Sequence, residues 1–209
     1  MKYIILLISL FGVELAFGQV KLDDEQKAQV LRTFNVASAK TNSMQCNFLQ
    51  IKEMKLLKKQ MQSKGKMFFV RPQKLCWQYD TPYKYTFILN GDKIHIKSDK
   101  SSQTIDIQKN KMFRQIADII LNSITGGHLS SSSDFSVEIW KHKNFYSAKL
   151  FPQKKELKKL YNLIEITFDY SMTMVKTIKM EEKSGDVTIV TLNNVVTNAT
   201  IKESVFNIH

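Results

Sequence analysis

Residues 65–79 read GKMFFVRPQKLCWQY, which places two short runs of β-favouring residues on either side of an Arg-Pro pair. Aromatic and β-branched residues suit a half-buried pleated surface, and proline suits a turn. In the second run, alternation puts Leu75 and Trp77 on one face of a strand and Cys76 on the other. The stretch therefore predicts two strands joined by a turn.

The same period-two pattern extends from this stretch through most of the chain. Turn-forming residues separate the individual runs, among them Asn90-Gly91-Asp92 and, by our interpretation, Ser63-Lys64-Gly65. Because glycine and proline are few, neighbouring runs are expected to form long hairpins in an antiparallel meander. The predicted strands cover residues 44–58, 65–71, 74–80, 84–90, 93–98, 101–107, 134–141, 145–151, 163–170, 173–181, 186–196 and 203–208.

Two amphipathic helices interrupt these strands. Asp23, followed three residues later by Gln26, gives a capping-box-like start to a helix over about 24–41. Apolar residues at 112–124 follow the i, i+3, i+4 rule, and a Gly-Gly pair ends that second helix. A short basic helix or loop is expected over 152–161. The helices can cap one side of a curled sheet, so the sequence predicts a mainly β (α+β) fold that can enclose a cavity.

Residues 1–18 have the order of a secretory signal peptide. A positive charge precedes an apolar stretch at 4–13, and a small-x-small triplet ends at Gly18. The alternative is an N-terminal membrane anchor, but the stretch is too short to span a bilayer and Glu14 interrupts it. We expect cleavage after Gly18, export to the periplasm, and one domain over 19–209.

The export route permits a disulfide between Cys46 and Cys76, the two cysteines of the sequence. Alternation, however, places Cys46 on the face of Phe48, whereas Cys76 lies opposite Leu75 and Trp77. Two unpaired thiols are therefore favoured over a disulfide.

The net charge of +12 comes from 31 Lys and Arg against 19 Asp and Glu. A basic protein with aromatic strands also describes some nucleic-acid modules. Here the lysines are dispersed, and export takes the chain away from cellular nucleic acid, so no nucleic-acid partner is expected. The one dense basic run, at residues 154–159, is a candidate for contact with anionic lipid headgroups or with a protein partner.

Sequence motifs for catalysis or metal binding are missing. The four histidines are scattered without HExxH spacing, and neither a cysteine pair at ligand spacing nor a GxSxG motif occurs. The pair Gly126-Gly127 closes a predicted helix instead of opening one, so it does not form a phosphate-binding loop. We expect no enzyme activity, no metal and no cofactor.

The stretch at 65–79, followed by Pro82, resembles the signature of the periplasmic outer-membrane lipoprotein carrier family, LolA. That signature is a glycine, a short strand, Arg-Pro, an apolar-x-Trp-x-aromatic strand and a proline. Further matches follow in order within residues 24–208: Phe48-Leu49-Gln50, Asn90-Gly91-Asp92-Lys93-Ile94, Gly185-Asp186-x-Thr188, Asn198 and Phe206. These ordered matches and the export signal together indicate a LolA-like domain.

The resemblance implies an incomplete, curled antiparallel β-barrel of about eleven strands, with a helical lid over an apolar cavity. Members of the family carry the acyl chains of lipoproteins through the periplasm. An inner-membrane ABC-type release complex loads them, and an outer-membrane acceptor receives the cargo. The expected partners are therefore acylated lipoproteins and these two membrane components, and we expect a monomer.

Arg71 matches the family's Arg-Pro arginine, which hydrogen-bonds to lid backbone in the closed, empty state, so the resemblance implies that Arg71 latches the lid. A planar group with several donors suits such a role. Leu75 and Trp77 match inward-facing positions of the family and are expected to line the acyl-chain cavity. Alternation and helix faces add weaker candidates, which either line the cavity or form packed core: Phe48, Phe68, Leu31, Phe34, Ile116, Ile119, Ile120 and Ile124.

The resemblance departs from many proteobacterial members at the C-terminus. The sequence ends shortly after Phe206, without the extension that keeps those carriers off the inner membrane. Delivery directly to a membrane surface is therefore an alternative to handover to an acceptor protein. Two other functions stay open from the sequence: a periplasmic lipid-sensing regulator of the anti-sigma-partner type, and a carrier of a different acyl lipid or glycolipid.

Overall fold

A computed structural model describes residues 18–109, 121, 134–171 and 174–207 of the chain. The predicted signal peptide, apart from Gly18, lies outside these residues. So does the predicted helix at 112–124, apart from Leu121, which is helical and packs against the core. No helix in the described part of the chain has the length and apolar character needed to cross a bilayer.

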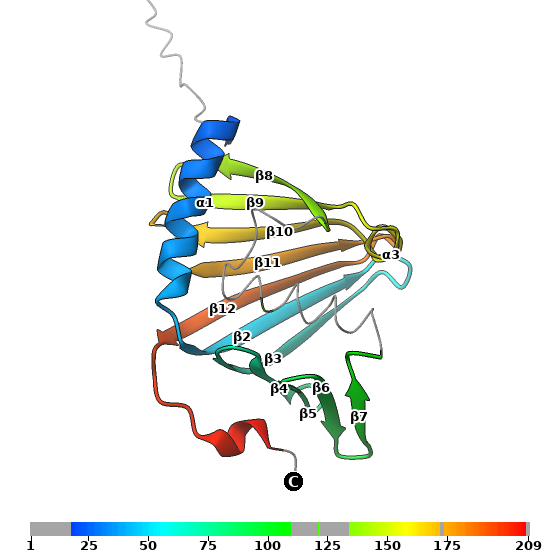
Figure 1. The fold of residues 1–209 in the computed structure, drawn as a ribbon. Helices are drawn as coiled ribbons and strands as arrows, with labels where there is room; N and C mark the ends of the chain where they lie inside the picture. The colour runs from blue at the N-terminus through cyan, green and yellow to red at the C-terminus, as the bar shows by residue number, and fades with distance from the viewer. Residues whose placement is uncertain (1–17, 110–120, 122–133, 172–173, 208–209) are drawn as a thin grey trace, which may run out of the picture.

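The described residues form a sheet of twelve antiparallel strands with helices beside it (Figure 1). The strands are β1 (Val20–Lys21), β2 (Ser43–Met54), β3 (Lys59–Val70), β4 (Lys74–Thr81), β5 (Tyr85–Asn90), β6 (Lys93–Ser98), β7 (Ser102–Asp106), β8 (Phe135–Lys141), β9 (Phe145–Pro152), β10 (Tyr161–Asp169), β11 (Val175–Glu182) and β12 (Val187–Thr197). The helices are α1 (Asp24–Ala39), α3 (Lys155–Leu160) and the 3₁₀ helix η1 (Glu203–Phe206).

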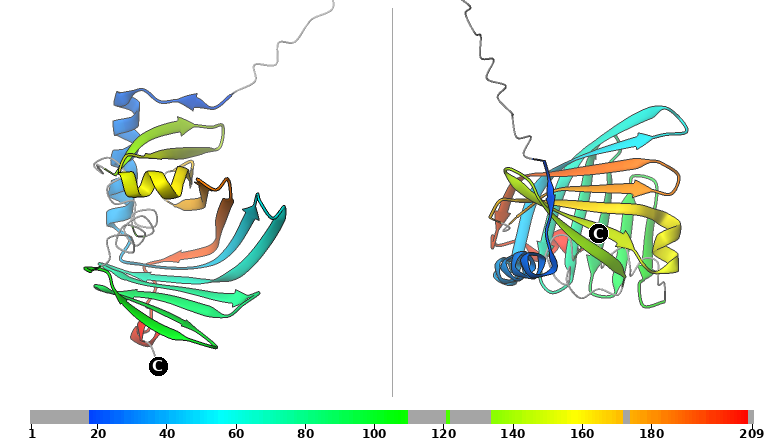
Figure 2. Two further views of the ribbon diagram at one scale, coloured as in Figure 1. Left: turned by 90° about the vertical axis from the view of Figure 1, so that its right-hand side faces the viewer. Right: turned by 90° about the horizontal axis from the view of Figure 1, so that it is seen from above.

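The sheet consists of two meanders that meet in its middle. Its order is β1-β8-β9-β10-β11-β12-β2-β3-β4-β5-β6-β7, so β12 pairs with β2 although they lie far apart in the chain. In this pair, Val187 lies opposite Glu53 and Thr197 opposite Met44. The sheet curls, but its end strands do not pair with each other (Figure 2). The predicted mainly β fold, an incomplete curled barrel, is confirmed, with twelve strands where the family resemblance implied about eleven.

Helix α1 lies on the concave side of the sheet, across one end of strands β8–β12 (Figures 1 and 2). The Asp23 side chain accepts a hydrogen bond from the Gln26 N–H at 2.8 Å, and the Gln26 side chain accepts one from the Asp23 N–H at 3.4 Å. This confirms the predicted capping box. Leu31 and Phe34 are buried, and the Phe34 ring meets Phe168 of β10 edge-on at 4.4 Å between centroids.

Buried apolar side chains occur on both faces of the sheet. Most of them form one cluster on the concave side, which we call the inner cluster and which includes Phe69, Ile166 and Leu192. A smaller outer cluster on the other face joins Cys76 and Ile88 to Phe206 of η1. The C-terminal segment therefore covers the outer face of β4 and β5, away from α1 (Figure 2).

The two cysteines are free and buried on opposite faces, which confirms the prediction of unpaired thiols. Cys46 lies in the inner cluster and Cys76 in the outer cluster. Burial raises the pKa of Cys46 to about 12 and that of Cys76 to about 11. Both thiols therefore stay protonated near neutral pH.

The first long hairpin differs from its prediction. The turn between β2 and β3 lies at 55–58, and the predicted turn at 63–65 is instead part of β3. Gly65 pairs with Phe48 in the sheet. A Cβ at Gly65 would lie 1.9 Å from the Gln78 carbonyl oxygen and 2.8 Å from the Phe48 ring. This glycine therefore permits close packing within a strand, a second common use of glycine besides turns.

Both ends of the described chain also differ from their predictions. Residues 203–206 form η1 and not a strand, because Phe206 packs into the outer cluster instead of extending a sheet edge. Strand β1 was not predicted, since two exposed residues carry no periodic pattern. The short basic segment near 152–161 is helical, as α3, with Leu157 buried.

Candidate functional site

The concave side of the sheet presents apolar side chains from its central strands. Phe48 on β2, Met67 and Phe69 on β3, and Leu75 and Trp77 on β4 are all at most 9% exposed. Antiparallel pairing aligns them, since Phe69 lies opposite Leu75 and Met67 opposite Trp77. Directly paired residues share a face of the sheet, so these side chains form one apolar surface.

Four aromatic rings lie together on this surface, and two of them carry hydroxyl groups: Phe48, Trp77, Tyr79 and Tyr85. The Phe48 ring lies 4.9 Å from both the Trp77 and the Tyr79 rings, and Tyr79 stacks on Tyr85 at 4.1 Å. The Tyr79 hydroxyl donates a hydrogen bond of 2.8 Å to Gln50 Oε1. Burial, with a smaller contribution from Tyr85, raises the pKa of Tyr79, so its hydroxyl remains a donor.

Trp77 carries a buried hydrogen-bond donor, its indole Nε1–H. Its Nε1–H has no hydrogen-bond partner among the residues that the structure describes.

Arg71 ties the sheet to the C-terminal end of α1. Its Nε donates to the Thr41 carbonyl at 2.7 Å, and its Nη2 donates to the Ser38 carbonyl at 2.9 Å and to Ser38 Oγ at 3.3 Å. The last carbonyls of a helix lack intrahelical partners and carry partial negative charge. The guanidinium satisfies two backbone carbonyls at once, so a side chain next to the β3–β4 turn holds the end of the helix.

The structure brings five of the predicted site residues together. The inner cluster contains Leu31 and Phe34 from α1, Phe48 from β2, and Leu75 and Trp77 from β4. The predicted helix-face candidates Ile116, Ile119, Ile120 and Ile124 lie outside the described residues.

Phe68 does not belong to this surface, so its prediction as a cavity residue is wrong. It lies opposite Cys76 in the β3–β4 pair and packs against the outer cluster. Its neighbours Met67 and Phe69 are fully buried on the inner side. Since side chains alternate along a strand, Phe68 must point to the convex side.

Met67, Phe69, Tyr79 and Gln50 belong to the site but were not among the predicted residues. Counting alternation from Trp77 through the hairpin register would have found the first two. Nothing in the sequence pairs Tyr79 with Gln50, because that contact depends on how β2 and β4 curl around Phe48.

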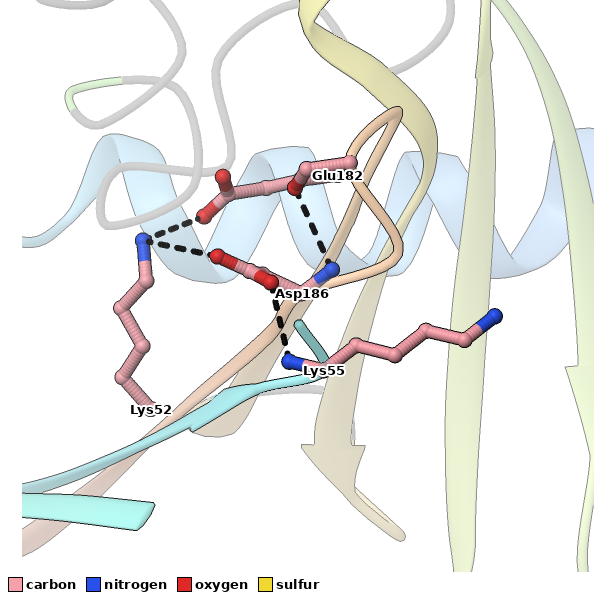
Figure 3. A network of polar contacts seen from close by, with 5 residues as sticks. Lys52, Lys55, Glu182 and Asp186 are labelled. Carbon is pink, nitrogen blue, oxygen red and sulfur yellow. Dashed lines mark hydrogen bonds and ion pairs between the residues drawn. The ribbon is translucent and has the colours of Figure 1, made fainter. Parts of the chain in front are cut away.

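A polar network lies at the other end of the strands, where the β2–β3 and β11–β12 turns meet (Figure 3). Lys52 Nζ lies 3.0 Å from Glu182 Oε1 and 3.9 Å from Asp186 Oδ2. The Lys55 N–H donates to Asp186 Oδ1 at 3.0 Å. Glu182 is therefore paired with a lysine.

The described residues contain no group of three or more His, Cys, Asp or Glu side chains that could hold a metal ion. His95 Nδ1 lies 2.7 Å from Thr104 Oγ1, and His142 Nε2 lies 3.1 Å from Ser147 Oγ. Each of these imidazoles is thus engaged with a hydroxyl group.

Comparison with known protein families gives one match that covers most of the chain. The model of the family described as "Outer membrane lipoprotein carrier protein LolA" matches residues 39–209. This span includes strands β2–β12 and η1, and only the last residue of α1. A comparison with curated proteins found no match.

Solved structures of similar fold cover nearly the same part of the chain at low sequence identity. An uncharacterized conserved protein from Thermus thermophilus has a TM-score of 0.51 at 4% identity, covering 88% of this chain and 94% of that one. A protein from Desulfovibrio piger has a TM-score of 0.50 at 10% identity, covering 88% and 96%. A LolA superfamily protein from Nitrosomonas europaea has a TM-score of 0.47 at 10% identity, covering 86% and 96%. The first two likenesses concern the fold alone.

Proposed function

Because the chain belongs to LolA, the family of outer membrane lipoprotein carrier proteins, we propose that it carries lipoproteins through the periplasm. In this proposal the signal peptide at residues 1–18 directs export and is removed after Gly18. The protein is a monomer that binds acyl chains and catalyses no reaction. An ABC-type release complex loads it at the inner membrane, and an outer-membrane acceptor or the membrane surface receives the cargo.

The observation that carries this proposal is the way α1 covers the inner cluster. Leu31 and Phe34 pack on the apolar surface, but Arg71 holds the end of the helix through hydrogen bonds to backbone and to Ser38. Hydrogen bonds can be exchanged for bonds to water, so the contacts that hold this end of the helix can break and form again. We therefore assign Arg71 the role of a latch on α1.

The surroundings of α1 support its movement. A surface hollow of about 430 Å³ lies beside the helix, lined by Leu22, Val30 and Tyr146 together with polar side chains. The helix is thus packed against the sheet on one side and borders open space on another.

The free energy of binding an acyl chain is large enough that release of the cargo requires a cover that can move, here α1. Burial is worth about 0.8 kcal/mol per methylene, so one acyl chain of roughly fifteen carbons contributes about 12 kcal/mol before any cost. A carrier with all of that affinity would not release its cargo. Closing α1 over the empty surface and remaking the Arg71 hydrogen bonds, each worth about 1.5–3 kcal/mol, offsets part of the cargo's binding energy.

The test is to identify what the protein holds when isolated from its own periplasm. We expect organic extraction and mass spectrometry to recover lipoproteins in stoichiometric amount. Phe48→Ser, on the inner surface, is expected to lose most of this cargo. Phe68→Ser, one strand away on the outer face, serves as the matched control and is expected to retain it.

Two results would contradict the proposal in different ways. Recovery of a glycolipid or another free lipid in place of lipoproteins would assign the same surface to a different cargo. Equal loading of the Phe48→Ser and Phe68→Ser variants would show that the inner surface does not hold the acyl chains.

A further inference from the structure

The turn between β2 and β3 exposes two leucines at its tip. Leu56 is 91% exposed and Leu57 is 60% exposed. Lys55 and Lys58 flank them, and Lys59 follows as the first residue of β3. Leu56 buries almost nothing in the fold and Leu57 buries less than half of its surface, so packing within the fold gives little reason for two leucines at this turn.

The tip projects beyond the neighbouring strand. Strand β4 begins to pair with β3 at Lys64, opposite Thr81. The residues from Lys59 to Ser63 therefore pair with β2 alone. The last part of this hairpin accordingly stands clear of the sheet on the β4 side (Figure 2).

Other basic segments lie at the same end of the strands. The Lys183 N–H donates to the carbonyl of Leu160, the last residue of α3, at 2.9 Å, which joins the β11–β12 turn to that helix. The same turn touches the hairpin tip, since a Cβ at Gly185 would lie 2.7 Å from the Lys55 side chain. We call residues 55–59, 154–159 and 183 together the basic end (Figure 1).

The charge of the basic end is strongly positive. Residues 55–59 contain three lysines and no acid, and residues 154–159 contain four lysines and one acid, Glu156. The nearby carboxylates Glu182 and Asp186 lie against Lys52 in the network of Figure 3. Asp134 pairs with Lys154.

We propose that the basic end docks on an anionic phospholipid surface, with Leu56 and Leu57 inserted among the headgroups. Apolar side chains gain free energy by reaching the acyl boundary, and lysines near the surface are attracted to anionic lipids. Lysine is depleted from protein–protein interfaces, which makes a lipid surface a better partner than a protein for this leucine-and-lysine tip. The inference goes beyond the proposed carrier function and does not depend on the cargo.

The docking residues are separate from the latch. Ser43, at the start of β2, pairs with Val70 beside Arg71, whereas the leucines follow the far end of the same strand. Variants at the tip therefore leave the α1 contacts and the inner surface untouched.

The experiment measures co-sedimentation of the mature protein with vesicles of phosphatidylcholine containing phosphatidylglycerol, and with vesicles of phosphatidylcholine alone. We expect binding to the anionic vesicles that weakens as salt is raised. The double variant Leu56→Ser, Leu57→Ser is expected to lower the partition constant on the order of tenfold or more, because two leucine side chains no longer leave water. Lys58→Gln with Lys59→Gln is expected to lower both the binding and its salt dependence.

Val36→Ser provides the matched control, since Val36 is 59% exposed but lies on α1. Its vesicle binding should equal that of the wild type. All variants should keep the wild-type thermal unfolding midpoint, because the changed side chains are exposed. Cargo content, measured separately, reports on the carrier function and not on docking.

Three results would overturn the inference. The wild type could fail to bind anionic vesicles, or the leucine variant could bind them as well as the wild type does. The third is a protein partner whose binding is lost in the leucine variant while the wild type ignores vesicles, which would make the basic end a protein interface.

Discussion

Gly65 lies within β3 with the Phe48 ring across it, so its missing side chain is part of the packing of the inner cluster. The methyl group added by Gly65→Ala forces the Phe48 ring and the β4 backbone at Gln78 to move away from residue 65. We expect the free energy of unfolding to fall by about 1–3 kcal/mol, the usual range for overpacking, or somewhat more because a backbone atom is involved. Urea unfolding followed by tryptophan fluorescence measures this change.

The neighbouring Lys66 provides the control, because its side chain is exposed on the same strand. Lys66→Ala should change stability by less than about 0.5 kcal/mol. Equal urea midpoints for Gly65→Ala and Lys66→Ala would disprove the close-packing role of the glycine.

The buried thiols make a second prediction at the residue scale. The thiolate is the reactive form, and burial raises the pKa of Cys76 to about 11 and that of Cys46 to about 12. At pH 8 about one thousandth or less of each thiol is therefore ionised. We expect an aromatic disulfide reagent to label the native protein very slowly at pH 8. Both thiols should react within the mixing time in about 6 M guanidinium, which unfolds all but hyperstable domains. Rapid labelling of either cysteine in the native protein would contradict their burial.

Phe68 shows why alternation located the site only in part. In β3, Met67 and Phe69 are apolar, but so are Phe68 and Val70 on the opposite side, and η1 covers that opposite side. Alternation identifies two faces but tells them apart only when one is polar. On β4 the family resemblance supplied the missing orientation, and Leu75 and Trp77 lie on the inner face as it implied, whereas their contact with acyl chains stays a prediction.

At the scale of elements, α1 and the Arg71 side chain behave as one unit. Arg71→Leu removes all three side-chain hydrogen bonds to Thr41 and Ser38. We expect amide hydrogen exchange in the last two turns of α1 to speed up on the order of tenfold or more, since local opening then costs less free energy. Arg71→Lys should give an intermediate effect, because a lysine retains the charge but lacks the planar set of donors.

Arg32→Leu is the control for this measurement. Arg32 lies on the exposed side of α1, and its side chain donates to Gln29 within the helix. Its exchange pattern should match that of the wild type. If Arg71→Leu transfers cargo to acceptor membranes at the wild-type rate, Arg71 is not a latch, whatever its effect on exchange.

Most elements could be predicted from local signals, and the exceptions share a cause. The capping box of α1 and the alternation of β4–β6 depend on neighbouring residues in the chain. The β2–β3 turn was misplaced because Gly65 carries the same local signal as a turn glycine, although its reason lies on β2 and β4. Likewise, Val205 and Phe206 have the apolar character of a strand, and only their packing on the outer cluster makes them helical.

At the scale of the molecule, the two apolar clusters have separate tasks in our proposal. Phe206 is 2% exposed and closes the outer cluster over Cys76 and Ile88. Phe206→Ala should lower the free energy of unfolding by about 3–5 kcal/mol, the range for deleting a buried phenylalanine. Because the change lies on the convex side, the amount of bound lipid per folded molecule should stay the same.

Phe145→Ala gives the comparison for this experiment, since Phe145 is 38% exposed on β9. Its urea midpoint should fall much less. Loss of cargo from folded Phe206→Ala protein would show that the outer cluster also shapes the inner surface, contrary to the separation proposed here.

The pairing of β12 with β2 determines when this protein can finish folding. A ribosome makes β2 among the first strands and β12 as the last, yet the two lie side by side in the middle of the sheet. Until residue 197 has been made, β2 presents a long unpaired edge of backbone donors and acceptors, which invites pairing with other chains. The chain must therefore be kept from aggregating until β12 is available to pair, and truncation anywhere before β12 leaves the centre of the sheet, and not merely its margin, without a partner.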